Sequence, residues 1–570
     1  MSQASWQERA ATKVAATAEK IPRGWRLRPQ DLERAKAEQD ITGKLIESFL
    51  PEHENAITRL DTTELAEMLA RGSLTCLEVT TSFCKRAAVA HQINNCLHEI
   101  FFDQAMVRAK ELDQHYEHHG VPTGALHGLP VSLKDQFHVK GIDTTMGYVG
   151  WIDTFEGNAD SSKVHNVESQ VVAELLQQGA IIYCKTSLPQ TLMYGETINN
   201  LIGQTLNPIN QRLSCGGSSG GEAALQALRG STIGLGTDIG GSVRIPAAFC
   251  GTYSLKPTHN RLSYRNVANT NPGQLSYASS VGVMGTSLDG VKLLTSSLLA
   301  TKPWLRDPDV VPLPWCADTE LSTLARANPV TGAATSTNPP LKVGIMFTDS
   351  FMTAHPPVIR GLHILKKALL NAGHKVIDWQ PPSHLSHHDL ARTHLRFLQS
   401  DGGHDIHHQL QLSGEPLIPP LRNIFKVEPP FDAIKIQQLS IEGRDFCAAY
   451  TDYWNSLAGD DRQEVDAFIM PVAPHAAVMP GRYLYTGYTE VLNLLDYSAA
   501  VVPVTRADRN VDIFDESYKP FNDLDEKNWK GYDAEVYDGA PVGLQIVARK
   551  YEEEKIWAVA KIVDLLLKNS

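Results

Sequence analysis

The sequence predicts an α/β fold in which helices flank one large, mixed and largely parallel β-sheet. Segments typical of strands alternate with segments typical of helices from about residue 95 to residue 260. The alternation resumes after a Pro-, Thr- and Ala-rich stretch at 325–340, the best candidate for a loop or linker. Strand segments on both sides of this stretch are equally apolar, so we expect one sheet and an excursion from it. The 570 residues are 42% hydrophobic, with 41 Gly and 32 Pro, which is ordinary for a globular protein.

The N-terminal residues 1–60 are expected to form a polar, helical arm that precedes a single domain at 61–570. The opening MSQASWQERAATKVAATAEK is charged and helical in pattern. It lacks the apolar centre of a signal peptide, so we expect a cytoplasmic protein. The pattern stays helical to about Gly120, except for CLHEIFF, which is consistent with a strand.

The core segment at 126–260 carries the clearest signals. In LHGLPVSLKD (126–135), apolar and polar residues alternate up to Lys134, which predicts a short strand whose two faces differ. ESQVVAELLQQGA (168–180) predicts a helix that ends at Gly179. A strand, a helix and two strands are expected to follow, in IIYCKT, GEAALQALRG, STIGLGTD and SLKPT.

The second half of the chain repeats the same kinds of segment. Strands are expected in LKVGIMF, HKVIDW, VDAFIMPVAP and APVGLQIVA. Helices are expected near 357–372, in the region up to about 457, and at the C-terminal end.

Charge and cysteine usage exclude several classes of protein. A net charge of −12 argues against a nucleic-acid partner, because binding phosphates needs clustered Lys and Arg. The eight cysteines are scattered and form no C-x-x-C pair, so neither a zinc site nor a disulfide framework is indicated. There is no run of about 18 apolar residues, so no membrane span is expected. A homo-oligomer remains open.

A glycine- and serine-rich stretch, SCGGSSGGEAAL (214–225), allows several structural and functional interpretations. Such clusters are most often loops. The phosphate-loop and dinucleotide patterns both fail here, whereas the nucleophile-elbow pattern G-x-S-x-G matches at Ser218 and at Ser219, without the strand that should precede it. Ser219 and Glu222 have the spacing of a capping box, so Ser219 is expected to cap the following helix. Ser218 would then lie just outside the helix with its hydroxyl free.

A second glycine turn lies in GLGTDIGGSVRIPAAFCG (234–251), where Gly240, Gly241 and Ser242 follow a strand. Glycines at such a position let successive backbone N–H groups point the same way, which is how main chain forms an oxyanion hole. An ordinary strand-to-helix turn is the alternative reading.

These motifs, taken together, resemble the amidase signature family, and within it the fungal acetamidases and general amidases. GGSSGGE, GTDIGGSVRIPAAFCG and the upstream GLPVSLKD stand in the family's order over about 130 residues of the 126–260 core, and Ser218 and Ser242 are 24 positions apart. Further similarity extends over nearly the whole chain, in FCKRAA, KTSLPQTLM, GQTLNP, SGEP, NLLDYSAAVVPVT and GAPVGLQIVARK.

The resemblance implies a Ser–Ser–Lys triad and an acyl-enzyme. Ser242 would be the nucleophile, Ser218 the proton-relaying serine after a cis Gly217–Ser218 bond, and Lys134 the base. A lysine can accept a proton only when neutral, which burial favours by lowering its pKa. The resemblance implies no metal or cofactor.

The surrounding residues receive supporting roles. The resemblance implies an oxyanion hole made by the amides of Ile239, Gly240, Gly241 and Ser242. Asp238 and Arg244 flank the nucleophile and are expected to pair and brace the turn. Leu192, Met193 and Tyr194 lie where relatives have an acyl pocket, although ordinary core packing is an equal alternative. Thr144 and Thr145 resemble a threonine pair of the family and receive no role.

The expected activity is hydrolysis of a small carboxamide substrate, such as acetamide, to carboxylate and ammonia. Two alternatives remain. One is the glutaminase subunit of a tRNA-dependent amidotransferase. The other is a serine esterase, or a lactam or carbamate hydrolase. The acidic balance and the whole-chain similarity to acetamidases argue against the first.

Overall fold

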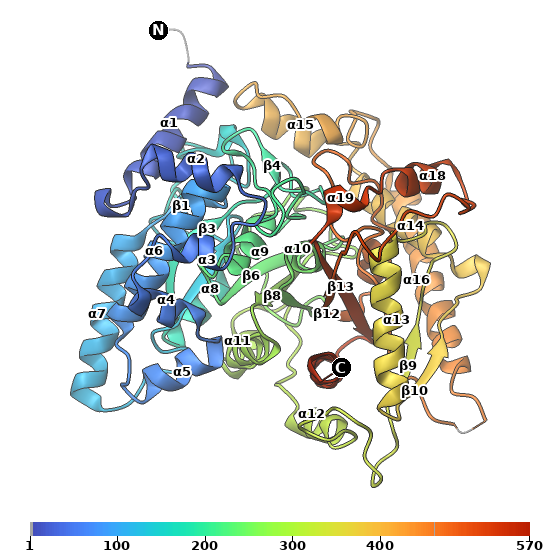
Figure 1. Ribbon diagram of the computed structural model, residues 1–570. Helices are drawn as coiled ribbons and strands as arrows, with labels where there is room; N and C mark the ends of the chain where they lie inside the picture. The colour runs from blue at the N-terminus through green and yellow to red at the C-terminus, as the bar shows by residue number, and fades with distance from the viewer. Residues whose placement is uncertain (1–3, 461, 570) are drawn as a thin grey trace.

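The computed structural model describes residues 4–460 and 462–569. In this part of the chain, an 11-stranded sheet forms the centre, with the order β1-β3-β2-β6-β8-β7-β12-β13-β11-β9-β10 (Figure 1). In that order the strands are β1 (Leu97–Ile100), β3 (Ile181–Thr186), β2 (Pro130–Lys134), β6 (Ile233–Asp238), β8 (Ser280–Gly285), β7 (Tyr253–Lys256), β12 (Ser498–Arg506), β13 (Pro541–Ala548), β11 (Ala467–Pro471), β9 (Lys342–Ile345) and β10 (Lys375–Asp378). A separate two-stranded sheet consists of β4 (Ile198–Asn199) and β5 (Gly203–Gln204).

The predicted α/β class and the single mixed sheet are confirmed, but the expectation of a largely parallel sheet is wrong. Only β2–β3, β2–β6, β9–β10 and β9–β11 pair in parallel. The central strands β6, β8, β7, β12, β13 and β11 pair antiparallel, as does β1 with β3 at the edge. The sheet therefore has parallel segments on either side of an antiparallel centre.

Two central strands, β8 and β12, were not predicted, and this explains the error in strand direction. β8 inserts between β6 and β7 and runs opposite to both. Its sequence SVGVMG contains two glycines, which weaken a strand signal. β12 carries Pro503 beside a break in its register with β13, and proline argues against a central strand. The other predicted strands are all present.

The N-terminal residues form helices that pack onto the main core. They are α1 (Trp6–Glu19), α2 (Pro29–Ala37), α3 (Lys44–Glu47) and α4 (Glu52–Arg59). Ile41, Ile46 and Ile57 are buried in the main hydrophobic cluster. The division into an arm at 1–60 and a catalytic domain at 61–570 stays a prediction.

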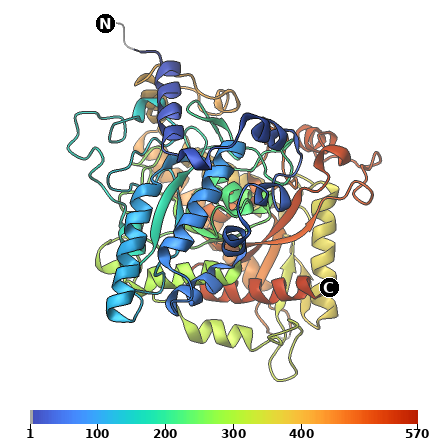
Figure 2. The ribbon, with the colours of Figure 1, turned by 60° about the vertical axis from the view of Figure 1, so that its left-hand side comes forward.

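The remaining helices flank the sheet, and α20 lies beside α11 (Figure 2). They are α5 (Thr62–Ala70), α6 (Cys76–Asn94), α7 (Phe102–His119), α8 (Gln170–Gln177), α9 (Gly220–Ala227), α10 (Arg244–Cys250), α11 (Leu288–Ala300), α12 (Ala317–Leu324), α13 (Pro356–Asn371), α14 (His387–Leu398), α15 (His404–Gln411), α16 (Ala433–Ser456), α17 (Gly487–Leu494), α18 (Asp523–Lys530), α19 (Ala534–Tyr537) and α20 (Glu553–Lys568). Short 3₁₀ turns lie at η1 (Arg23–Trp25), η2 (Val149–Trp151), η3 (Pro303–Leu305), η4 (Ser383–Leu385) and η5 (Pro419–Leu421). The stretch at 325–340 is a loop between α12 and β9, as predicted.

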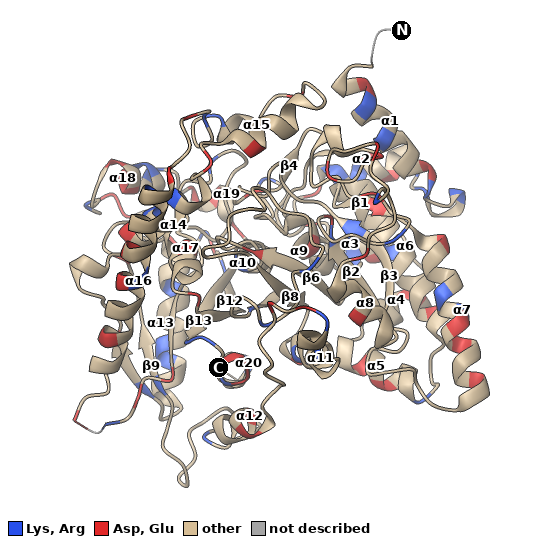
Figure 3. Cartoon of the chain, turned by 180° about the vertical axis from the view of Figure 1, so that it is seen from behind, with Lys and Arg blue, Asp and Glu red and all other residues tan. Residues whose placement is uncertain are grey.

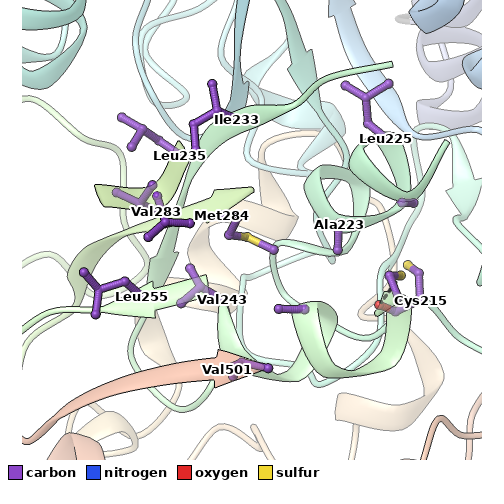
Figure 4. Close-up of a cluster of buried hydrophobic side chains, with 14 of the residues drawn as sticks. Cys215, Ala223, Leu225, Ile233, Leu235, Val243, Leu255, Val283, Met284 and Val501 are labelled. Carbon is purple, nitrogen blue, oxygen red and sulfur yellow. Dashed lines mark hydrogen bonds between the residues drawn. The ribbon is translucent and has the colours of Figure 1, made fainter. Parts of the chain in front are cut away.

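The two glycine-rich motifs lead into α9 and α10, which contact each other over the middle of the sheet. Their apolar residues pack on β6, β7, β8 and β12 (Figure 4). Ala223 and Val243 lie in this cluster with Leu235, Val283 and Val501, all of which are buried. This packing fixes the starts of α9 and α10 relative to the ends of the strands.

Charges of both signs lie side by side along outer helices such as α7 and α16 (Figure 3). Six of the cysteines are buried and unpaired, where they pack as small core residues. Among the described residues, none of the helices is both long and apolar enough to cross a bilayer.

Candidate active site

Lys134 is the last residue of β2 and is completely buried. Since β2 and β6 run parallel, their carboxyl ends meet at one edge of the sheet, which brings Lys134 next to Thr237. The Lys134 ammonium nitrogen lies 2.6 Å from Ser218 Oγ and 3.1 Å from Thr237 Oγ1. Thr237 in turn donates to the side-chain oxygen of Gln136 at 2.6 Å. Thr237 and Gln136 were not predicted, because nothing in their local sequence indicates a contact with the lysine.

Burial lowers the pKa of Lys134 from 10.5 to about 7, although the negative charge of Asp238 opposes this shift. Removing an ammonium group from water disfavours the charged form. At neutral pH a large fraction of Lys134 is therefore the free amine, which is the form that can accept a proton.

Ser218 follows a cis peptide bond from Gly217, as the resemblance implies. Gly217 is closely surrounded, because a Cβ there would stand 2.7 Å from the carbonyl oxygens of both Glu196 and Tyr194. The next amide, that of Ser219, donates to the carbonyl oxygen of Ser242 at 3.0 Å. This backbone bond places the two glycine motifs against each other. In the described chain, no hydrogen bond joins the Ser218 and Ser242 hydroxyls directly.

The predicted capping box at the start of α9 is wrong. Ser219 occupies the N-cap position, but its side chain accepts no hydrogen bond from the helix. Glu222 instead turns toward the sheet and accepts from Ser132, from Thr186 at 2.9 Å and from Gln226 at 3.0 Å. Its complete burial raises the pKa of Glu222 to about 7. The Glu222 carboxylate therefore accepts from buried hydroxyl groups on the neighbouring strands, and not from the backbone at the start of α9 as the local spacing predicts.

Asp238 organises the turn before Ser242. Its carboxylate accepts from the amide of Gly241 at 2.9 Å and from the amide of Val243 at 3.1 Å. Gly241 has φ +125°, and a Cβ there would lie 2.6 Å from Thr489 Oγ1. Only glycine fits both the backbone conformation and the space at this position.

The free amides of the turn differ from the predicted set. Gly241 was expected to serve an oxyanion hole, but its N–H is already bonded to Asp238. Among the described residues, the amides of Ile239, Gly240 and Ser242 have no hydrogen-bond acceptor. An oxyanion bound at this turn would supply the hydrogen-bond acceptor that these three amides lack.

The predicted pairing of Asp238 with Arg244 is present and completely buried. The guanidinium donates from Nε at 3.1 Å and from Nη2 at 2.9 Å to the two carboxylate oxygens. Arg244 also donates to the Thr489 carbonyl at 3.1 Å and to Gln545 Oε1 at 3.0 Å. The guanidinium holds the pKa of Asp238 well below its usual range despite burial.

Ser242 lines a partly open pocket of about 210 Å³. Leu192, Met193 and Tyr194 line it, as do Gly217, Ile239 and Gly240. The rest of the wall is mainly apolar and comes from far along the chain, with Leu395, Leu398, Ile424, Phe425, Tyr483 and Leu484. The sequence did not single out these distant residues.

A second buried polar cluster supports the same edge of the sheet. Asp135 pairs with Lys185 at 3.0 Å and accepts from Thr145 Oγ1 at 3.0 Å. Lys185 also donates to Thr144 Oγ1 at 2.7 Å. The two threonines therefore hold the chain next to Lys134 in place.

Comparison with known proteins identifies the class. A family model described as Amidase matches residues 78–557, and the chain therefore belongs to the amidase family, which confirms the resemblance. The chain is 41% identical over 568 residues to an acetamidase of Emericella nidulans, with 99% of each protein covered. It is 40% identical to an acetamidase of Aspergillus oryzae over 568 residues, covering 100% of both. A solved structure of a fatty acid amide hydrolase superposes with a TM-score of 0.88 at 31% identity, over 98% of this chain and 95% of that chain. The protein is accordingly a hydrolase of amide C–N bonds.

Proposed function

We propose that this enzyme hydrolyses small primary carboxamides to carboxylate and ammonia, with Ser242 as nucleophile, Ser218 as proton relay and Lys134 as base. The observation that carries the proposal is the buried lysine, whose nitrogen lies 2.6 Å from Ser218 Oγ. A hydroxyl becomes an effective nucleophile only when a base takes its proton. Lys134, with its pKa lowered to about 7 by burial, is suited to that task.

The first half of the reaction forms an acyl-enzyme. Ser242 Oγ attacks the amide carbonyl as its proton passes to Ser218, and the Ser218 proton passes to the neutral amine of Lys134. This relay requires the Ser242 hydroxyl to turn toward Ser218 as substrate binds. The amides of Ile239, Gly240 and Ser242 would stabilise the oxyanion, each at about 3–4 kcal/mol. Lys134 then returns its proton through Ser218 to the nitrogen, the C–N bond breaks, and ammonia leaves.

The second half of the reaction repeats the relay with water. A water molecule attacks the acyl carbon, its proton passes through Ser218 to Lys134, and Ser242 leaves with that proton as a free hydroxyl. The products are a carboxylate and the regenerated enzyme. The whole-length similarity to acetamidases supports a small amide over glutamine on a charged tRNA.

The proposal is tested with purified enzyme, a panel of primary amides from acetamide to hexanamide, and a fluorophosphonate probe. We expect release of ammonia, and labelling of Ser242 that disappears in Ser242→Ala. Ser218→Ala should retain its fold, lose most amidase activity and label slowly. Ser322→Ala, on the exposed side of α12, is the matched control and should behave like wild type. Folded enzyme that releases no ammonia from any amide, or carries its label on Ser218, would contradict the proposal.

A further inference from the structure

The pocket that contains Ser242 has a charged side chain in its mainly apolar wall. Glu490, from the first turns of α17, lines this cavity and is only 7% exposed. Its side chain lies over Gly240, since a Cβ on Gly240 would be 3.2 Å from Glu490 Cγ and 3.6 Å from its Oε1. Gly240 is two residues before Ser242, so their Cα atoms are at most about 7 Å apart. The carboxylate therefore belongs to the same small chamber as the proposed nucleophile.

Glu490 has no hydrogen-bond donor among the described residues. A basic group, His394 on α14, lies within ion-pair range: its Nδ1 is 3.8 Å from Glu490 Oε2, which is beyond hydrogen-bond distance. His394 is completely buried, and neither of its ring nitrogens has a hydrogen-bond partner. The hydroxyl of Tyr483, another cavity residue, is also buried without a partner. Buried polar groups are normally paired, and a carboxylate that faces a mainly apolar pocket gains from N–H donors placed there.

The missing partner of Glu490 is best supplied by a bound ligand. Leu395, Leu398 and Ile424 form the adjoining wall and offer no charge that could serve instead. Beside a mainly apolar wall the attraction between opposite charges is stronger than in open water. A ligand that carries an ammonium group would give the carboxylate both a counter-charge and N–H donors.

We propose that Glu490 is a specificity-determining residue that binds an ammonium group in the acyl part of the substrate. The favoured substrates would be ω-amino carboxamides with a short chain between the two functions. This inference rests on the proposed function, because it places the scissile carbonyl at Ser242. The leaving group of a primary amide is ammonia, so a second nitrogen must lie on the acyl side. The closeness of Gly240 to Ser242 puts that nitrogen a few bonds from the carbonyl.

The kinetic test uses pairs of amides that differ only by exchange of NH₃⁺ for CH₃. Suitable pairs are 4-aminobutanamide with pentanamide and 3-aminopropanamide with butanamide, at pH 7. In at least one pair we expect wild type to have a kcat/KM at least about 10-fold higher for the ammonium member. Glu490→Gln, which keeps the shape and removes the charge, should lower that ratio at least about 10-fold. Glu535→Gln, at an exposed carboxylate on α19, is the matched control and should keep it.

A binding measurement separates this inference from the proposed chemistry. In Ser242→Ala, n-butylammonium chloride should raise the Tm more than 1-butanol with equal KCl does. Adding Glu490→Gln should abolish the difference. If His394 already neutralises Glu490 as an ion pair, neither the kinetic nor the thermal preference will appear, and the inference is overturned.

The two possible failures are distinguishable. Efficient hydrolysis of pentanamide, together with no preference for 4-aminobutanamide, would leave the proposed function intact and overturn the role of Glu490. Absence of all amide hydrolysis and of Ser242 labelling would overturn the proposed function, while the thermal shift would still decide whether Glu490 binds ammonium groups.

Discussion

The most informative single residue is Lys134, a lysine with no solvent contact and a hydroxyl as its closest partner. At pH values below its pKa of about 7, Lys134 is mainly the ammonium ion, which cannot accept a proton. We therefore expect kcat/KM for a neutral amide to rise about 10-fold per pH unit below pH 7 and to level off above it. Lys134→Met, which retains much of the side-chain volume, should lose at least about 10²-fold in rate and lose this dependence. An unchanged pH profile in the variant would exclude Lys134 as the base.

The buried pair of Asp238 and Arg244 gives a prediction about stability. Removing one member leaves the other charged and unpaired, which typically costs about 3–5 kcal/mol. Arg244→Met should lower the free energy of unfolding by that amount, and the double variant Asp238→Asn/Arg244→Met should recover part of the loss. Urea denaturation measures both. Arg444→Met breaks the exposed contact with Asp445 and should cost less than about 1 kcal/mol. Equal losses for Arg244→Met and Arg444→Met would contradict the bracing role.

The positions of residues near the proposed site were predictable where a motif fixes them, whereas contacts with distant parts of the chain were not. The motifs brought attention to Lys134, Ser218 and Ser242, and the structure brings the segments that carry them together. The capping box failed because Glu222 finds buried donors on two strands, which local spacing cannot reveal. Glu490 carries no local signal at all, since its relation to Gly240 spans 250 residues of chain.

At the scale of elements, the loop before α9 depends on a lack of side-chain volume. Gly217→Ala would place a methyl group 2.7 Å from two backbone carbonyl oxygens, which cannot move aside as a side chain can. We expect a loss of about 1–3 kcal/mol in the free energy of unfolding and a severe loss of fluorophosphonate labelling. Gly273→Ala is the matched control, because a Cβ there meets no atom within 4 Å. Labelling of Gly217→Ala at the wild-type rate would contradict this account.

Most strands and helices were predictable because their hydrophobic period is clear. β3 and β6 were expected almost to the residue, and both lie in fully buried positions. β8 and β12 were not predicted, because glycine and proline weaken the hydrophobic pattern of a strand. In the structure, pairing with a neighbouring strand on each edge stabilises them. The direction of the central strands follows from these two elements, which is why the mixed sheet was predictable and its antiparallel centre was not.

At the scale of the whole molecule, the buried lysine links stability to pH. The folded-state pKa of Lys134 is about 7, whereas the unfolded value is near 10.5, so between these values the unfolded chain binds the extra proton. Stability should therefore rise with pH in this window, by about 1.4 kcal/mol per pH unit from this one group. In Lys134→Met, this contribution to the rise of the free energy of unfolding with pH should be absent.

The measurement is urea denaturation of both proteins from pH 7.5 to 9.5. The difference in free energy of unfolding, wild type minus Lys134→Met, should grow by a few kcal/mol over that range. Contributions from other titrating groups are common to both proteins and cancel in the difference. A constant difference would mean that Lys134 keeps an ordinary pKa in the folded enzyme.

The contact of Arg244 with a residue far along the chain has a consequence for folding during synthesis. One N–H of its guanidinium donates to Gln545 Oε1, 301 residues further along the chain. A ribosome that has just exposed the Ser242 turn has not yet synthesised the strand that completes its support. The nascent chain therefore carries every proposed reactive group long before it can use them, and activity should begin only after Gln545 has been synthesised.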